Sequence, residues 1–176
     1  MFEQVDQIPK GTKVVDSKLV LTIKENPDGS IERYKARVVA RGFTQHPDEY
    51  GEISSPVIDA AVIRYSLGLA ATHDLEIAVL DVPTAYLGAT LHEEVYMRLP
   101  EADWTSIGFS EVRPVVKLRK SVPGLKQSGR SWYEDITTFL TTSLNLKQSI
   151  SAPGLFFSET FLLNLYVDDL MLIGKW

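Results

Sequence analysis

The sequence contains no cysteine, which excludes disulfide bonds and any zinc or iron–sulfur site built on thiolates. The sequence has only three histidines, His46, His73 and His92. They form no i, i+4 pair of the kind that binds zinc on a helix. No apolar run is long enough to cross a bilayer, and the N-terminus lacks the pattern of a signal peptide. We therefore expect an intracellular protein, cytoplasmic or nuclear, that does not contact a membrane.

An excess of positive charge is also missing, because the 176 residues carry a formal net charge of −5. The cations are nevertheless clustered in two segments without acids, residues 33–41 and 113–130, while acids gather between residues 81 and 111. Two basic segments around an acidic one would suit a phosphate channel with metal-binding carboxylates inside. An ordinary mixed surface explains the same charge counts equally well.

The composition, 44% hydrophobic and 23% charged, is that of one globular domain or of two small subdomains that share a core. Turn residues 26–30, with the sequence Asn-Pro-Asp-Gly-Ser, separate two predicted strands, residues 18–23 and 31–40. In the second strand Arg33, Lys35 and Arg37 alternate with other residues. A period of two places this charge on one face of the predicted hairpin.

Two long helices are predicted, one over residues 61–71 with Asp59 as its cap and one over residues 128–144. A short helix is expected after residue 81, with Pro83 in its first turn. The other predicted strands are residues 76–80, 94–99, 115–118, 155–157, 161–167 and 170–173. Because many neighbouring segments are joined by tight turns, we expect an α+β fold with a largely antiparallel sheet packed on helices.

Three aspartates lie where predicted strands end. Asp81 follows the strand of residues 76–80, and Asp168 and Asp169 separate two apolar strands. Taken singly, Asp81 is explained as a helix cap and the adjacent pair as an ordinary polar turn. Together, carboxylates at the ends of strands in one sheet can hold two Mg²⁺ ions roughly 3.5–4 Å apart for phosphoryl transfer. The triplet is therefore more specific than either of its parts.

Several motifs occur in one order along nearly the whole chain. They are residues 26–30, 34–45, 55–57, 80–82 with 84–87, 93–97, 124–127, 130 with 132–133, and 165–169, the last reading Leu-Tyr-Val-Asp-Asp. On these motifs the chain resembles the reverse transcriptase domain of copia-type retrotransposon polyproteins. The resemblance implies a right-hand polymerase, with a fingers-like basic hairpin at about residues 14–45 and a palm-like portion at about residues 56–176.

The same resemblance implies the roles of individual residues. Asp81, Asp168 and Asp169 would be the catalytic carboxylates, holding two Mg²⁺ ions or Mn²⁺ as a substitute. Tyr86 occupies the position of the aromatic ring that excludes a ribose 2′-OH, although a core tyrosine is the alternative. The candidates for binding nucleotide or template are Lys35, Arg37, Arg41, Tyr86, Lys126 and Gln127. The implied partners are an RNA template, a DNA primer and deoxynucleoside triphosphates.

Some positions depart from the family pattern, among them Leu19, Pro83, Pro123 and Gly129. The sequence also ends shortly after the strand that follows Asp169, so we expect no thumb within it. Two alternatives to a reverse transcriptase fragment stay open. One is an inactive retroelement remnant that binds nucleic acid or protein, and the other is a metal-dependent nuclease built on the same carboxylates.

Overall fold

The computed structural model describes residues 2–5 and 7–175. The chain divides into two compact units, each built from two stretches of sequence. Unit 1 comprises Met1–Ile53 and Tyr86–Ser131, and unit 2 comprises Ser54–Ala85 and Trp132–Trp176. In the described part of the chain, no helix is both long and apolar enough to span a bilayer.

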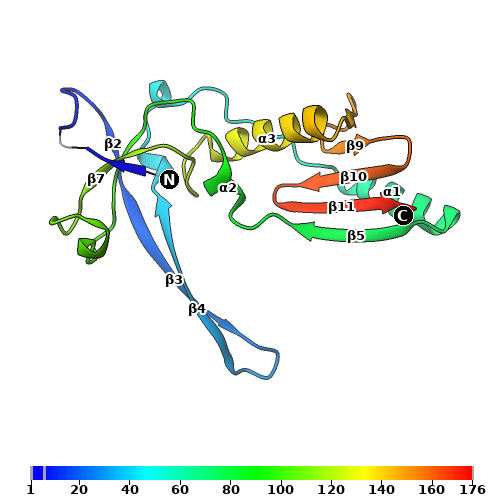
Figure 1. Ribbon diagram of the computed structural model, residues 1–176, viewed down its shortest axis with the longest axis horizontal. Coiled ribbons are helices and arrows are strands. Elements are labelled where there is room, and N and C mark those ends of the chain that lie inside the picture. The colour runs from blue at the N-terminus through cyan, green and yellow to red at the C-terminus, as the bar shows by residue number, and fades with distance from the viewer. Residues whose placement is uncertain (1, 6, 176) are drawn as a thin grey trace. The chain divides into compact units, whose positions relative to one another are not determined.

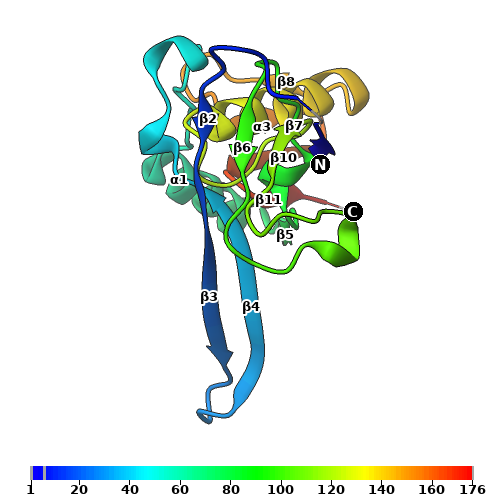
Figure 2. The same cartoon turned by 90° about the vertical axis from the view of Figure 1, so that its left-hand side faces the viewer.

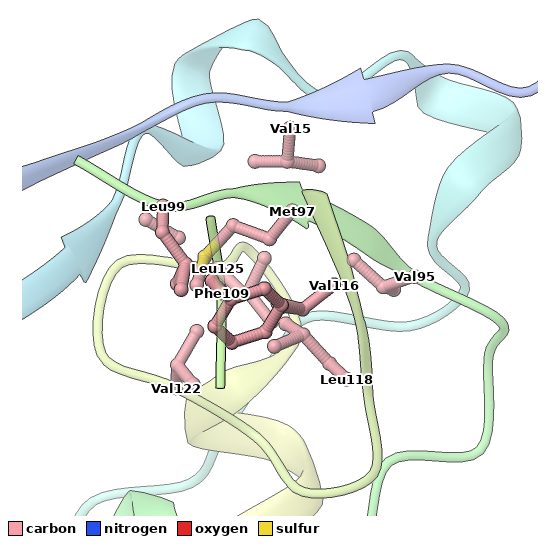
Figure 3. Packing of buried hydrophobic residues seen from close by; sticks show 10 residues of the cluster. Val15, Val95, Met97, Leu99, Phe109, Val116, Leu118, Val122 and Leu125 are labelled. Carbon is pink, nitrogen blue, oxygen red and sulfur yellow. The ribbon is translucent and has the colours of Figure 1, made fainter. Parts of the chain in front are cut away.

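The core of unit 1 lies against a four-stranded sheet with the strand order β1-β7-β6-β2. Its strands are β1 (Phe2–Gln4), β2 (Val14–Val15), β6 (Tyr96–Arg98) and β7 (Val115–Leu118). The β2–β6 pair is parallel and the other pairs are antiparallel. Figure 3 shows Met97, Val116 and Phe109 packed together at the centre of this core.

A long two-stranded ribbon extends from unit 1 (Figures 1 and 2), formed by β3 (Ser17–Glu25) and β4 (Ile31–Ala40). Directly opposed residues of an antiparallel pair share a face. Arg37 lies opposite Val20, Lys35 opposite Thr22, and Arg33 opposite Lys24. The predicted basic face is therefore confirmed, and Leu21 and Tyr34 belong to the opposite, apolar face.

The base of the ribbon is joined to the loop of residues 123–127 by close backbone contact. The Ala40 N–H donates to the Pro123 carbonyl at 2.8 Å, and the Gly42 N–H donates to the Gly124 carbonyl at 3.0 Å. Gly124 has a φ of +96°, and a Cβ atom on it would lie 2.2 Å from the Ala40 carbonyl oxygen. Only glycine satisfies both the backbone conformation and the contact.

Short elements complete unit 1. They are the 3₁₀ turns Gly42–Thr44, Pro47–Glu49 and Thr105–Ile107. The short helix α2 (Ala85–Gly88) begins with the last residue of one stretch of unit 2 and continues into unit 1. The helix starts two residues later than predicted. Pro83 lies in the turn before it, because Thr84 adopts a left-handed φ of 58° that no helical turn accommodates.

Unit 2 is a five-stranded antiparallel sheet with the order β5-β11-β10-β9-β8. Its strands are β5 (Glu76–Asp81), β8 (Lys147–Gln148), β9 (Leu155–Phe157), β10 (Phe161–Tyr166) and β11 (Asp169–Gly174). Figure 1 shows β9, β10, β11 and β5 side by side. The Ser66 hydroxyl of α1 (Ala60–His73) donates to the Asn164 carboxamide oxygen on β10. Leu163 and Leu165 are buried on the other face of that strand.

The predicted long helices are both present. Asp59 caps α1 by accepting a hydrogen bond from the Ala61 N–H, as expected. The second helix, α3 (Ser128–Thr138), continues as a π-helical turn over Phe139–Ser143. The mixed α and β composition is confirmed, whereas β1, β2 and β8 were not predicted, because two or three residues are too few to show a period.

The fit between Gly124 and Ala40 predicts a cost for Gly124→Ala. We expect it to lower the free energy of unfolding by roughly 2–4 kcal/mol, since it adds a left-handed non-glycine residue and an overlap with backbone. Gly29→Ala is the matched control, because Gly29 has a φ of +82° but nothing within 4 Å of its added Cβ. The control should lose only about 1–2 kcal/mol. Equal losses in urea unfolding would show that the contact contributes nothing.

Candidate functional site

The three aspartates singled out from the sequence meet at one end of the unit 2 sheet. Asp81 is the last residue of β5 and lies directly opposite Asp169, the first residue of β11. Asp168 occupies the turn before β11, and its backbone carbonyl accepts a hydrogen bond from the Val82 N–H at 2.8 Å. All three are exposed. Opposed side chains share a face with Cβ atoms about 4.5–5.5 Å apart, so Asp81 and Asp169 are neighbours.

This arrangement concentrates negative charge. Two like charges directly opposite each other in a sheet are destabilising. Within residues 2–5 and 7–175, no lysine, arginine or histidine forms an ion pair with Asp81, Asp168 or Asp169. The repulsion between Asp81 and Asp169 is therefore not offset by a neighbouring cationic side chain.

The donor chemistry of these aspartates fits a divalent cation. Mg²⁺ prefers carboxylate oxygens and keeps several waters or substrate oxygens, which exposed carboxylates leave room for. Over the described residues, however, no three histidine, aspartate or glutamate side chains are grouped closely enough to hold a metal ion by themselves. The structure thus brings together one opposed pair, Asp81 and Asp169, with Asp168 beside it in the turn.

The turn that carries Asp168 has a strained backbone and is stabilised by a hydrogen bond from α3. Val167 has a φ of 57°, which is unfavourable for a β-branched residue. The indole Nε1–H of Trp132, on α3, donates to the Val167 carbonyl at 2.6 Å. Trp132 is a buried core residue. Its hydrogen bond additionally fixes the turn between β10 and β11.

The candidate nucleotide-binding residues all belong to unit 1. Lys35 and Arg37 share the basic face of the ribbon, and Arg37 is exposed. Arg41 follows β4 and pairs with Asp16 at 3.4 Å. Tyr86 is half-buried in α2. Among the described residues, no carboxylate lies within salt-bridge distance of Arg37.

Three cations of the second basic segment pair with carboxylates. Arg113 pairs with Asp16 at 2.6 Å, Lys117 pairs with Glu94, and Arg119 Nε donates to Glu3 at 2.8 Å. The Lys117–Glu94 contact raises the pKa of Lys117 above its usual range. Although this segment contains no acids in the sequence, its cations up to Arg119 are therefore paired with acids from elsewhere in the chain.

The two candidate residues in the loop of residues 124–127 differ in burial, since Lys126 is exposed and Gln127 is buried. The Lys126 ammonium lies over the Tyr50 ring, 5.7 Å from its centroid, which leaves it at the surface of the loop. Gln127 is only 1% exposed. Its carboxamide oxygen accepts a hydrogen bond from Gln45 Nε2 at 3.1 Å.

Comparison with known proteins places this chain in a family. The family model described as reverse transcriptase (RNA-dependent DNA polymerase) matches residues 1–176. The chain belongs to this family. The copia-type resemblance drawn from the ordered motifs is thereby confirmed.

The curated relatives are plant transposon polyproteins. The retrovirus-related Pol polyprotein from transposon TNT 1-94 of Nicotiana tabacum is 40% identical over 178 residues, which cover 96% of this chain and 13% of that protein. The corresponding polyproteins from transposons RE2 and RE1 of Arabidopsis thaliana are each 40% identical and match 99% of this chain. This reverse transcriptase chain spans about an eighth of the length of these relatives.

Two contacts at the site were not predicted. Gln45 lies within a motif of the family, but nothing in the sequence indicates that its side chain forms hydrogen bonds with Lys126 and Gln127. The bond from Trp132 to the Val167 carbonyl is equally invisible in the sequence, because a tryptophan on an apolar helix stripe signals only burial. Both contacts join segments that are distant in sequence.

The backbone of Val167 predicts an unusual gain of stability. We expect Val167→Gly to raise the free energy of unfolding by about 1 kcal/mol, because glycine adopts a positive φ without the cost that valine incurs. Val79→Gly is the matched control, since Val79 is an exposed residue of β5 and should lose stability there. Urea unfolding of both variants checks the prediction, and a loss in Val167→Gly would contradict it.

The opposed carboxylates predict that metal and stability are linked. Without divalent metal, Asp81→Asn should raise the free energy of unfolding by about 0.2–1 kcal/mol, because it removes a like-charge pair. Millimolar Mg²⁺ should stabilise the parent more than this variant, since the metal binds the folded state. Asp74→Asn is the control, because Asp74 caps the C-terminus of α1, just before β5 begins at Glu76, in a left-handed conformation that asparagine also accepts. An identical Mg²⁺ response in all three proteins would exclude a metal at Asp81.

Proposed function

We propose that this chain carries the catalytic carboxylates of an RNA-directed DNA polymerase, which extends a DNA primer on an RNA template with deoxynucleoside triphosphates. The observation that supports it most directly is the register that places Asp81 opposite Asp169, with Asp168 in the adjoining turn. In a chain of the reverse transcriptase family, carboxylates at this sheet end suit phosphoryl transfer.

In this proposal Asp81, Asp168 and Asp169 hold two Mg²⁺ ions, or Mn²⁺ in their place. Such ions supply charge neutralisation for the attacking and leaving oxygens of an in-line displacement. The protein's own part is to keep Asp81 opposite Asp169 at the end of a sheet, with Asp168 in the adjoining turn. The buried strands β10 and β11 supply a rigid support, and Trp132 holds the turn through the Val167 carbonyl.

The proposal assigns the fingers to about residues 14–45 and the palm to about residues 56–176, and it assigns no thumb to these 176 residues. The candidates for contacting nucleotide or template are Lys35, Arg37, Arg41, Lys126 and Gln127. Cations on one face of an extended ribbon suit a phosphate backbone, because phosphate contacts supply most of the affinity for nucleic acid. Tyr86 is proposed to exclude a 2′-OH, the group that distinguishes ribonucleotides.

One observation favours a second function. Since no three carboxylates among the described residues are grouped as a finished metal site, a remnant that only binds nucleic acid through its ribbon fits the same structure. Such a module would depend on Arg37 and Lys35 and not on Asp168. The two functions therefore make opposite predictions for the aspartates.

The deciding measurement is Mg²⁺-dependent primer extension on an RNA template. We expect Asp81→Asn and Asp168→Asn to reduce incorporation at least about a hundredfold, because metal coordination contributes several kcal/mol to the transition state. Asp74→Asn, which removes the same charge from the same unit, should retain the parent rate. Mn²⁺ should substitute for Mg²⁺ in the parent.

Each other result has a defined meaning. A folded parent that binds template but incorporates no nucleotide would favour the binding module. Degradation of labelled nucleic acid without incorporation would indicate a nuclease that uses the same carboxylates. Undiminished incorporation by Asp168→Asn would refute the carboxylate assignment itself.

A further inference from the structure

One face of the ribbon formed by β3 and β4 is apolar and open to water (Figure 2). Three cross-strand pairs lie on it, and we call their six residues the apolar ribbon face. The pairs are Leu19 with Val38, Leu21 with Ala36, and Ile23 with Tyr34. Leu21 is 71% exposed and Tyr34 is 75% exposed. A contiguous apolar patch of several hundred Å² on a protein surface is typical of an interaction site.

The charges of the ribbon lie away from this face. None of the six residues is charged. The cations of the three pairs' neighbours lie on the opposite face, because side chains alternate along a strand. They are Lys18, Lys24, Arg33, Lys35 and Arg37. The acids Glu25 and Glu32 are nearer the turn, beyond the last of the three pairs. The apolar ribbon face therefore offers a partner neither a cation nor an anion.

This separation of charge decides which partner fits. Nucleic acid owes most of its affinity to phosphate contacts, which the basic face can supply and the apolar face cannot. The exposed apolar residues of β5 do not match either, since Val79 shares a face with Asp81 and Leu80 shares a face with Glu76. A second apolar ribbon face carries no charge. Identical patches are also what a two-fold symmetric dimer joins.

We propose that the apolar ribbon face binds the same face of a second copy of this chain, so that the two ribbons pack face to face. Sheets that pack in this way lie about 10 Å apart, with the side chains of both inner faces filling the space. Both basic faces then point outward. A two-stranded hairpin is marginally stable by itself, and the second ribbon supplies the missing apolar layer. The association does not depend on the polymerase activity proposed above, because it uses none of the three aspartates.

The size of the face sets the expected affinity. Given the exposed fractions of its side chains, closing it would bury on the order of 500 Å² per copy, or about 1,000 Å² in total. Stable specific interfaces bury about 1,200–2,000 Å², and weaker, transient ones lie below that range. We therefore expect a reversible dimer with a Kd of roughly 10–1,000 µM.

Sedimentation equilibrium of the 176-residue chain, freed of nucleic acid, tests the association. Between about 5 µM and 1 mM the average mass should rise from that of one chain toward that of two. Leu21→Thr should raise the Kd at least about tenfold, because it removes a central apolar side chain and keeps a residue that favours strands. Val79→Thr is the matched control, since Val79 is 68% exposed on β5, and it should leave the Kd unchanged.

Two results of this measurement would overturn the proposal. One is a parent that stays monomeric up to about 1 mM, and the other is a dimer whose Kd does not respond to Leu21→Thr. If Leu21→Thr does not fold, Tyr34→Thr takes its place, because Tyr34 is the more exposed of the two.

Cross-linking tests which face is used. The chain contains no cysteine, so a single introduced thiol reports only its own position. Leu21 belongs to the middle one of the three pairs, and Thr22 lies opposite Lys35 on the basic face. A bis-maleimide with a reach of about 10 Å, the distance between packed sheets, should join two copies of Leu21→Cys and not two copies of Thr22→Cys. Equal yields from the two variants would contradict face-to-face packing.

Salt separates this dimer from two chains that are bridged by nucleic acid. An apolar interface without charges should keep its Kd, or tighten, when NaCl is raised from about 0.1 M to 1 M. Association that appears only after RNA is added, and is lost at about 1 M NaCl, would identify phosphate contacts of the basic face as its cause. That outcome would overturn the proposal, whereas loss of primer extension alone would not affect it.

Discussion

The register between β5 and β11 is the constraint on which the candidate site depends. Six consecutive pairs align the two strands, from Asp169 opposite Asp81 to Gly174 opposite Glu76. Between these ends, Leu170 pairs with Leu80 and Ile173 pairs with Ile77. A slip of one residue would turn one aspartate to the other face of the sheet. The pairing of the two strands therefore keeps the carboxylates opposite each other, although their own repulsion would move them apart.

Two energetically unfavourable features lie at this end of the sheet, and the packing of the rest of unit 2 offsets them. The opposed aspartates repel each other, and Val167 is held at a positive φ. Strain and like charge persist only where the surrounding structure imposes them, here through buried Leu165 and Ile173 and the hydrogen bond from Trp132. Unfavourable terms gathered at one end of an otherwise well-packed sheet are typical of a site whose residues serve a ligand.

Most of this could be predicted from the sequence because it depends on local pattern. The alternation of charged residues predicts the ribbon and its basic face, and Asp59 predicts the start of α1. The apolar segments on both sides of Asp168 and Asp169 predict the hairpin. The sequence does not reveal which distant side chains neutralise or orient one another. The pairing of Arg113 with Asp16 and the bond between Gln45 and Gln127 each span more than eighty residues, and only the tertiary fold determines them.

In unit 1, two motifs that are separated in the sequence meet at the base of the ribbon. A two-stranded ribbon is marginally stable in isolation, so the cations on β4 need an anchor at its base. That anchor is the loop of residues 123–127, which binds the end of the ribbon through Ala40, Gly42 and Gln45. A glycine at position 124 is the condition that lets the base of the ribbon and this loop meet.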